Sequence, residues 1–278
     1  MQKKTLLAVM TALVIGLAIV YLLWGRQARR STEATGGEAT AAAKGDSPSG
    51  QASRITERPG SAPLDGGLAV STVAAAAIEG EVQFTGVAAP AGKLHREADP
   101  YCARHPMADP TVLVANGKLA NVWVHVVKGA PEAAAPAAAV ELDQQDCMYA
   151  PRVMTAVVGQ KIVVRNDDPV LHNVHAYLGA STLFNKSMPN EKATHIEYVT
   201  AESGVIKWKC DVHPWMRGYL GVSRNAFQAV TGADGLFRIA NLPPGRYTLE
   251  AWHEKFGAKM LEVTAPARIV FAYDGTEH

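Results

Sequence analysis

Between residues 76 and 224, the hydrophobic positions of the chain come in short runs that are rich in β-branched and aromatic residues. Examples are "GEVQF", "NVWVHVV", "KIVVRN", "GVIKWKC" and "YLGVS", and Gly, Pro, Asn and Asp separate such runs. This pattern predicts β-strands joined by turns. No long segment shows an amphipathic helical period. We therefore expect an all-β fold, for which two packed sheets are the usual architecture.

The pattern changes near Arg224. Beyond it, "VTGADGLFRIANLPPGRYTLEAW" carries an Asp-Gly turn and a Pro-Pro-Gly turn between hydrophobic stretches. These turns predict three further strands. We therefore expect one β-sandwich over residues 76–224, with extra strands at its N-terminal end, and a smaller β-sandwich over residues 225–278.

The first 75 residues have a different character. Thr5–Gly25 contain no charged residue, and this stretch is long enough to cross a bilayer as a helix. From Gly25 to Thr72 the chain has no aromatic residue and consists mostly of Ala, Gly, Ser, Thr and Pro, which disfavours a folded core. We expect a transmembrane signal anchor over residues 1–25, with a cleaved signal peptide as the alternative, and a disordered linker over residues 26–75.

The charge of the chain argues against one class of partner and leaves the orientation at the membrane open. The formal net charge is +1, and the chain lacks the basic stripe that nucleic-acid-binding proteins carry, so we expect no nucleic-acid partner. Basic residues flank the apolar stretch on both sides, so they do not set its orientation. The chemistry inferred below requires export. We expect a single-pass protein of the inner membrane with its folded domains in the periplasm, or a secreted or periplasmic protein if the signal is cleaved.

The three cysteines indicate which thiol is free to bind a metal. The chain has three cysteines, Cys102, Cys147 and Cys210, and in an oxidising compartment two of them would pair. Cys210 lies in "KWKCDVHPWMRG", close to His213 and Met216, whereas no histidine lies near Cys147 in the sequence. We therefore expect a Cys102–Cys147 disulfide and a free Cys210 thiolate. The alternative is three buried thiols that act as small apolar residues.

A thiolate, imidazoles and a thioether together are the ligands of a type 1 copper site, whereas zinc prefers four strong donors. The second histidine has two candidates, His172 and His175 in "NDDPVLHNVHAY". Residues three apart in a strand point to opposite faces, so only one of the two can readily face the metal. A second sequence of similar type, "YCARHPM" around Cys102, has no accompanying histidine motif, so we favour the disulfide there over a second metal site.

Two of these motifs resemble the copper-binding motifs of cupredoxins of the amicyanin and pseudoazurin kind. "CDVHPWM" is similar to their C-x-x-H-P-x-M copper loop, and "LHNVHA" is similar to the segment that carries their first ligand. Upstream, "MYAPRVMTAVVGQKIVVRNDD" resembles the strand, turn and strand before that ligand. The resemblance covers about residues 140–223 and implies a Greek-key β-sandwich with one type 1 copper site.

The resemblance also implies which residues serve the site. The implied copper ligands are His172, Cys210, His213 and Met216. Asn173 is implied to brace the loop that carries Cys210, and His175 is expected beside the site rather than on the metal.

We further expect a docking surface for a redox partner. Trp215 lies inside the copper loop and could line an apolar patch around an exposed edge of His213, to which Met188 and Pro189 could contribute. The alternative for Trp215 is a position in the core.

The C-terminal sequence resembles the carboxypeptidase regulatory-like module, a small transthyretin-like β-sandwich, over about residues 226–272. It contains no nucleophile–base arrangement and no zinc H-x-x-E motif. We expect His253 and Glu254 in "WHEKFG" to be a solvated strand end rather than a metal site. The whole chain is similar to exported bacterial proteins that join a cupredoxin to this module, some of them assigned to methylamine utilisation.

These observations predict a non-enzymatic, membrane-tethered blue-copper protein that transfers electrons to or from a redox protein, for example a cytochrome c or a periplasmic dehydrogenase. One alternative is a copper carrier or assembly factor that uses the same ligands without a redox partner. The other is a scaffold or adhesion protein of two β-sandwiches that binds no metal.

Overall fold

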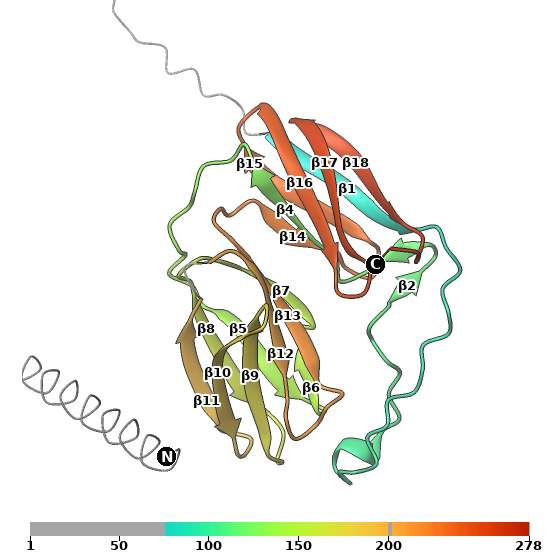
Figure 1. Cartoon of the computed structure of the whole chain (residues 1–278), viewed down its shortest axis with the longest axis vertical. Coiled ribbons are helices and arrows are strands. Elements are labelled where there is room, and N and C mark those ends of the chain that lie inside the picture. Colours follow the sequence, from blue (N-terminus) through green and yellow to red (C-terminus); the bar gives the residue numbers. More distant parts are fainter. Residues whose placement is uncertain (1–75, 200–201, 278) are drawn as a thin grey trace, which may run out of the picture. The chain divides into compact units, whose positions relative to one another are not determined.

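The computed structural model describes residues 76–199 and 202–277 of the chain (Figure 1). Within these residues the chain forms eighteen β-strands and one short 3-10 helix, η1 (Cys102–Arg104). The prediction of an all-β fold is confirmed. No helix in this part of the chain is long and apolar enough to span a membrane. The predicted signal anchor over residues 1–25 and the predicted linker over residues 26–75 lie outside the described residues.

Strands β5 to β13 form a two-sheet β-sandwich, which we call sandwich I. Its sheets have the strand orders β10-β9-β12-β13-β7 and β11-β8-β5-β6. The bounds of these strands are β5 (Val140–Gln145), β6 (Met148–Ala150), β7 (Val153–Val157), β8 (Lys161–Asn166), β9 (His172–Leu178), β10 (Ser181–Met188), β11 (Thr194–Tyr198), β12 (Gly204–Lys209) and β13 (Arg217–Ser223). Both sheets contribute to one buried core, with Leu142 and Val164 from one sheet and Trp208 and Leu220 from the other.

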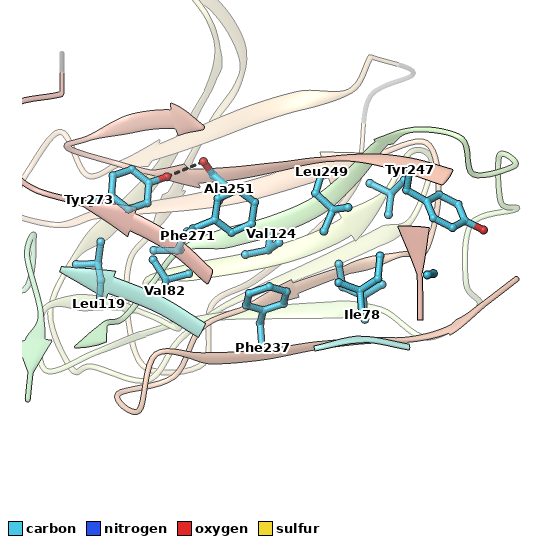
Figure 2. Close-up of a cluster of buried hydrophobic side chains, with 14 of the residues drawn as sticks. Ile78, Val82, Leu119, Val124, Phe237, Tyr247, Leu249, Ala251, Phe271 and Tyr273 are labelled. Carbon is cyan, nitrogen blue, oxygen red and sulfur yellow. Dashed lines mark hydrogen bonds between the residues drawn. The ribbon is translucent and has the colours of Figure 1, made fainter. Parts of the chain in front are cut away.

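The remaining strands form a second β-sandwich, sandwich II. One sheet has the order β15-β1-β3-β2, with β18 also paired to β1, and the other has the order β14-β4-β16-β17. The bounds are β1 (Ala76–Phe84), β2 (Val114–Ala115), β3 (Lys118–Leu119), β4 (Trp123–Lys128), β14 (Gln228–Val230), β15 (Leu236–Leu242), β16 (Gly245–His253), β17 (Gly257–Ala265) and β18 (Ala267–Tyr273). Figure 2 shows its core, in which Val82 and Phe271 from one sheet meet Val124 and Leu249 from the other.

Sandwich II combines strands from both ends of the described chain. β1 runs antiparallel to β15 and parallel to β18, and β4 lies between β14 and β16. The expected division into residues 76–224 and 225–278 therefore differs from the observed strand pairing. Strands β1 to β4 belong with the C-terminal strands, and sandwich I is inserted between β4 and β14. Alternating hydrophobic positions identify a strand and its buried face but not its partner, which is why the sequence did not reveal this arrangement.

A long loop between β1 and β2, residues 85–113, contains η1 and is called the strap here. It leaves sandwich II and extends alongside sandwich I (Figure 1). The Cys102–Cys147 disulfide, with Cα atoms 5.6 Å apart, joins the strap to the β5–β6 turn of sandwich I. The predicted disulfide is therefore present, and Cys210 is the free cysteine.

The two sandwiches also contact each other directly. The ring of Trp123 in β4 covers Gly221 in β13, where an added Cβ would come within 2.3 Å of the ring. Trp123 forms a small buried cluster with Val153 and Tyr219 of sandwich I. Because only a glycine leaves room for the ring at this point, the contact depends on residue 221 having no side chain.

The side chains of His253 and Glu254 in "WHEKFG" are buried rather than solvated, which corrects the expectation from the sequence. His253 is fully buried, and the Glu254 side chain is only 3% exposed. Arg152, which follows β6 in sandwich I, forms an ion pair with Glu254. A charged residue can be buried when a partner of opposite charge is buried with it, and that partner is distant in the sequence.

Candidate metal centre

The predicted metal ligands come from two neighbouring strands of sandwich I. His172 is the first residue of β9, and Cys210 directly follows β12. The two strands are paired, with Lys209 opposite His175, so Cys210 and His172 lie at the same end of the sheet. His213 and Met216 lie on the short loop between Cys210 and β13. The loop is closed by hydrogen bonds from the Met216 N–H to the His213 carbonyl oxygen, at 2.9 Å, and from the Cys210 N–H to the Met216 carbonyl oxygen, at 3.4 Å.

Three of the four predicted ligands present donor atoms to one point. One ligand atom each of His172, Cys210 and His213 lies within 4.8 Å of the others, and all three residues are buried. The Nδ1 atoms of the two histidines are 2.9 Å apart, and the Cys210 Sγ is 3.9 Å from the His213 Nδ1. Metal–nitrogen and metal–sulfur bonds in proteins are about 2.0–2.3 Å long, so a single ion can reach all three atoms with small adjustments.

Met216, the predicted axial ligand, is fully buried and belongs to the same core cluster as Cys210. Its position on the loop after His213 keeps it on the side of sandwich I where the other three candidates lie. A buried thioether at this place is compatible with a weak fourth ligand.

Hydrogen bonds favour the thiolate form of Cys210. Burial raises its pKa, but hydrogen bonds from His172, from His213 and from the backbone N–H groups of Asn173 and His213 outweigh burial and lower the pKa to about 6. The His213 N–H lies 3.3 Å from the sulfur. The thiolate is the form that binds metals, so the site is prepared for a cation.

The pKa of His172 shifts in the opposite direction to that of Cys210. Burial lowers its pKa, but the hydrogen bonds to Asp168 and Cys210 outweigh burial and raise it. The candidate centre therefore combines a stabilised anion on the Cys210 sulfur with a His172 ring whose protonated form is also stabilised.

Asn173 connects β9 to the loop that begins at Cys210. Its Oδ1 accepts a hydrogen bond from the Asp211 N–H at 2.6 Å, and its Nδ2 donates to the Asp211 Oδ2 at 2.9 Å. His175 lies outside the cluster of donor atoms. Its Nδ1 is 3.0 Å from the Asp211 Oδ2, and its Nε2 is 3.1 Å from the Thr182 hydroxyl.

The strap covers the site, which contradicts the expected docking patch around an exposed edge of His213. His213 is only 3% exposed, because its Nε2 faces the Asp99 Oδ2 at 3.3 Å and the Cys102 Sγ at 3.7 Å. Both covering residues belong to the strap. The sequence of the loop after Cys210 does not reveal this cover, because no feature of the loop indicates a segment that lies more than a hundred residues earlier in the sequence.

The other predicted patch residues also have different environments. Met188 is 1% exposed and lies in the core. Pro189 is exposed. Trp215 is partly buried, and its Nε1–H donates a hydrogen bond to the Cys147 carbonyl oxygen at 3.0 Å. The indole therefore fastens the loop after Cys210 to the β5–β6 turn.

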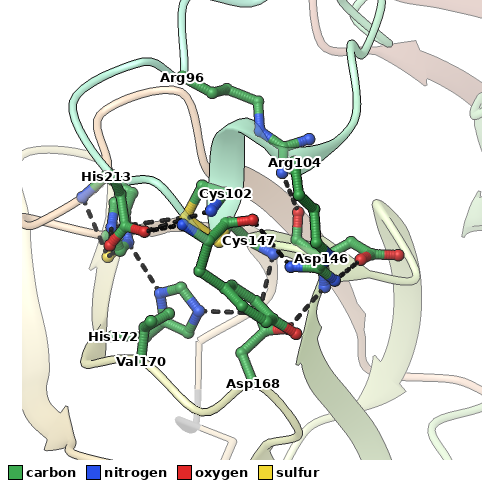
Figure 3. Close-up of a disulfide and its surroundings, with 12 residues drawn as sticks. Arg96, Cys102, Arg104, Asp146, Cys147, Asp168, Val170, His172 and His213 are labelled. Atoms are coloured by element: carbon green, nitrogen blue, oxygen red, sulfur yellow. Dashed lines mark hydrogen bonds and ion pairs between the residues drawn. A yellow bond between two sulfur atoms is a disulfide. The ribbon is translucent and has the colours of Figure 1, made fainter.

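Two carboxylates beside the histidines were not identified from the sequence. The Asp168 Oδ2 lies 2.9 Å from the His172 Nε2, and Asp99 faces His213 as described. Figure 3 shows His172, His213, Asp168 and the disulfide gathered in one place. Asp168 stands four residues before His172 in "NDDPVLH", so a local signal existed for it, whereas Asp99 gave none.

Asp168 also organises the β5–β6 turn. Asp146 and Cys147 have φ angles of 53° and 55°, the left-handed region used by two-residue hairpin turns. Their N–H groups donate to the two oxygens of Asp168 at 2.9 Å and 2.8 Å. The same carboxylate therefore holds the turn that carries Cys147 and the ring of His172.

Comparison with known proteins gives matches among solved structures. These neighbours are cupredoxins. The purple cupredoxin from Nitrosopumilus maritimus is 27% identical, with 30% of this chain and 99% of that chain covered and a TM-score of 0.27. A reduced amicyanin variant is 24% identical, with 36% of this chain and 98% of that chain covered and a TM-score of 0.28. No protein-family model matches the chain, and no curated protein matches it.

Proposed function

We propose that this protein is a type 1 copper protein that transfers electrons. The observation that carries the proposal is the buried convergence of the Cys210 sulfur with the Nδ1 atoms of His172 and His213. One thiolate, two imidazoles and a nearby thioether are the donor types that select this kind of copper site. Copper bound there would alternate between Cu(I) and Cu(II) and so carry one electron.

The protein residues would keep the site in one geometry. Cys210 follows a strand whose backbone is paired on both sides, to β9 and to β13. Asn173 fixes Asp211 near the start of the loop, and Trp215 fastens the loop to the β5–β6 turn. Because these restraints come from the fold itself, the ligands need to move little when the charge of the metal changes.

Location and partners complete the proposal. The Cys102–Cys147 disulfide is typical of oxidising compartments, which supports a periplasmic location for the two sandwiches. The apolar N-terminal stretch would hold the protein at the inner membrane. We propose no enzymatic activity and a redox protein as partner, such as a cytochrome c or a periplasmic dehydrogenase. Sandwich II, whose C-terminal strands resemble the carboxypeptidase regulatory-like module, would serve as a rigid support.

The visible spectrum of the copper-loaded full chain tests the proposal. With Cu(II) we expect an intense band from charge transfer between the Cys210 thiolate and copper, which disappears on reduction and returns on oxidation. Cys210→Ser should abolish the band, whereas Ser223→Cys, which adds a thiol at a buried position away from the loop, should not restore it in that background.

The alternatives give different results in the same experiment. A wild-type chain that binds Cu(I) tightly but shows no thiolate band and no reversible oxidation would be a copper carrier. A chain that binds no copper would instead support the alternative of a scaffold or adhesion protein.

A further inference from the structure

Each candidate ligand imidazole has its second nitrogen opposite a carboxylate. The His172 Nε2 lies 2.9 Å from the Asp168 Oδ2, with both side chains no more than 1% exposed. The His213 Nε2 lies 3.3 Å from the Asp99 Oδ2, with the side chains 3% and 24% exposed. The two carboxylates come from different parts of the fold, Asp168 from the loop before β9 and Asp99 from the strap.

The surroundings of Asp168 require a carboxylate. Its Oδ1 accepts hydrogen bonds from the Tyr101 hydroxyl at 3.0 Å and from the Asp146 N–H at 2.9 Å. Its Oδ2 accepts from the Cys147 N–H at 2.8 Å, which leaves the remaining acceptor position for the His172 Nε2. With donors on every side, the oxygens cannot rotate away, and the ring nitrogen opposite them must carry the hydrogen.

Asp99 is held in a comparable way. Its Oδ1 accepts hydrogen bonds from the N–H groups of Tyr101 at 2.8 Å and Cys102 at 3.2 Å, so its Oδ2 is aimed at His213. Cys102 is bonded to Cys147. The disulfide therefore fixes the strap in the position where Asp99 reaches the ring.

These contacts determine which nitrogens remain for a metal. With hydrogen on both Nε2 atoms, the lone pairs of both Nδ1 atoms face the same space, 2.9 Å apart. Two lone pairs at that distance repel each other, so either a proton on one of the Nδ1 atoms or a bound cation must lie between or beside them. A carboxylate that accepts from the far side of an imidazole also makes the ring a stronger donor, and a stronger donor stabilises the more highly charged metal ion.

We propose that Asp168 and Asp99 are positioning residues that keep the Nδ1 atoms of His172 and His213 directed at the metal and favour Cu(II) over Cu(I). The preference for Cu(II) rests on the proposed function, whereas the orientation of the two imidazole rings does not. No motif in the copper loop assigns this role to either residue.

The first test needs no metal and uses the full chain. Nuclear magnetic resonance of the imidazole nitrogens and their protons should show a hydrogen-bonded, slowly exchanging Nε2–H on both His172 and His213. Asp168→Asn should remove the His172 signal from its downfield position and leave that of His213. The matched control is Asp167→Asn, because Asp167 is adjacent and exposed. A wild-type His172 without hydrogen on Nε2, or an unchanged signal in Asp168→Asn, would overturn the proposal.

The second test measures affinities for Cu(II) and Cu(I) separately, by competition with chelators of known affinity. Asp168→Asn should weaken Cu(II) binding by about 10- to 100-fold, and Cu(I) binding by a smaller factor. Asp99→Asn should change the ratio of the two affinities in the same direction and leaves the bonds to the β5–β6 turn intact. Equal losses for both ions in both variants would contradict the preference for Cu(II).

A further variant separates positioning from folding. Tyr101→Phe removes one hydrogen bond to Asp168 but touches neither imidazole, so it should lower stability without changing the ratio of Cu(II) to Cu(I) affinities. A change in that ratio as large as in Asp168→Asn would show that any loosening of the strap has the same effect, and the proposal would fail. If the wild type binds no copper, the proposed function fails and the magnetic resonance test alone decides the position of the rings.

Discussion

At the scale of single residues, His253 shows how burial controls protonation outside the metal centre. The ring is fully buried in sandwich II and stacks on Phe256, with the ring centroids 4.7 Å apart. Its Nδ1 accepts the Lys255 N–H at 3.2 Å. Burial is the main cause that lowers the pKa of His253 from 6.5 to about 4; Arg152 and Lys255 add to the effect and Glu277 opposes it. The ring is therefore neutral in the folded protein at moderately acidic pH.

This shift predicts a loss of stability in acid. Between pH 6.5 and pH 4 the unfolded chain binds a proton at His253 that the folded chain does not, so the free energy of unfolding decreases as the pH falls, by up to about 3 kcal/mol. Urea unfolding of the metal-free chain at pH 7 and pH 4.5 measures the decrease. His253→Phe should reduce the difference between the two pH values, whereas replacement of the exposed His105 in the same way should not. An unchanged difference in His253→Phe would show that other groups cause the acid sensitivity.

Met216 provides a second test at this scale. Met216→Leu should retain copper but raise the reduction potential, because a weak axial donor that helps to stabilise Cu(II) is lost. The exchange conserves volume and should cost less than about 1.5 kcal/mol of stability. Voltammetry of the loaded protein gives the potential. Met154→Leu in β7, also buried in the core of sandwich I, is the control and should leave the potential unchanged. Equal potentials in wild type and Met216→Leu would exclude Met216 as a ligand.

At the scale of elements, the strap is the segment that covers the candidate metal centre. It contributes Asp99 and Cys102 to the surroundings of His213, and Arg96 and Arg104 fasten it to the β5–β6 turn. The Arg96 Nη2 donates to the Asp146 carbonyl oxygen at 2.7 Å, and Arg104 forms an ion pair with the Asp146 side chain. The disulfide is one of several links between the strap and sandwich I.

Removal of the disulfide should therefore loosen the strap without dismantling the metal centre. For a sequence separation of 45 residues, the chain-entropy estimate gives a loss of about 4 kcal/mol in Cys102→Ala/Cys147→Ala. We expect a lower urea midpoint, a retained thiolate band in the folded protein, and a faster change of that band when azide is added, because His213 is less covered. Thiol counting on the unfolded, metal-free wild type should give one free cysteine. Three free thiols, or loss of the band in the folded variant, would contradict this account.

At the scale of the whole molecule, one side chain joins three parts of the fold. Arg152 follows β6 of sandwich I, and its Nη2 donates to the Glu254 Oε2 of sandwich II at 2.8 Å and to the Thr111 hydroxyl of the strap at 3.2 Å. The Arg152 and Glu254 side chains are 9% and 3% exposed. Such a pair contributes little as a pair, but either charge alone would be buried without compensation.

Single substitutions at this pair should therefore be costly. We expect Glu254→Gln to lower the free energy of unfolding by about 3–5 kcal/mol, and the double change Arg152→Met/Glu254→Leu to lower it by much less. Glu97→Gln in the exposed Lys93–Glu97 pair is the control and should cost less than about 1 kcal/mol. Denaturant unfolding measures all of these. A double variant as unstable as the single one would mean that the bond to Thr111 or the shape of the side chains matters more than the charge.

The convergence of Cys210 and His213 could be predicted from the sequence, because a tight loop holds the two residues close together whatever surrounds it. The disulfide could be predicted because three cysteines leave one unpaired, and the neighbouring His213 and Met216 indicated that the unpaired one is Cys210. The partners of β1 and β4 could not be predicted. The alternation of hydrophobic and polar residues in a strand specifies which face is buried but not which strand lies beside it. Asp99 could not be assigned either, since it reaches His213 across 114 positions of sequence through a loop without a periodic pattern.

The insertion of sandwich I between β4 and β14 has a consequence for the order of events during synthesis. β1 leaves the ribosome before nearly all of its partners, because Ile78 pairs with Ile239 and Ala267, and every residue of sandwich I is made in between. Sandwich I can close while β1 to β4 still lack these neighbours. Contacts between such distant segments form slowly, and unpaired strand edges attract other chains. Newly made molecules should therefore pass through a stage in which sandwich I is closed and the N-terminal sheet still has unpaired strand edges. A chaperone that covers such edges would act at that stage.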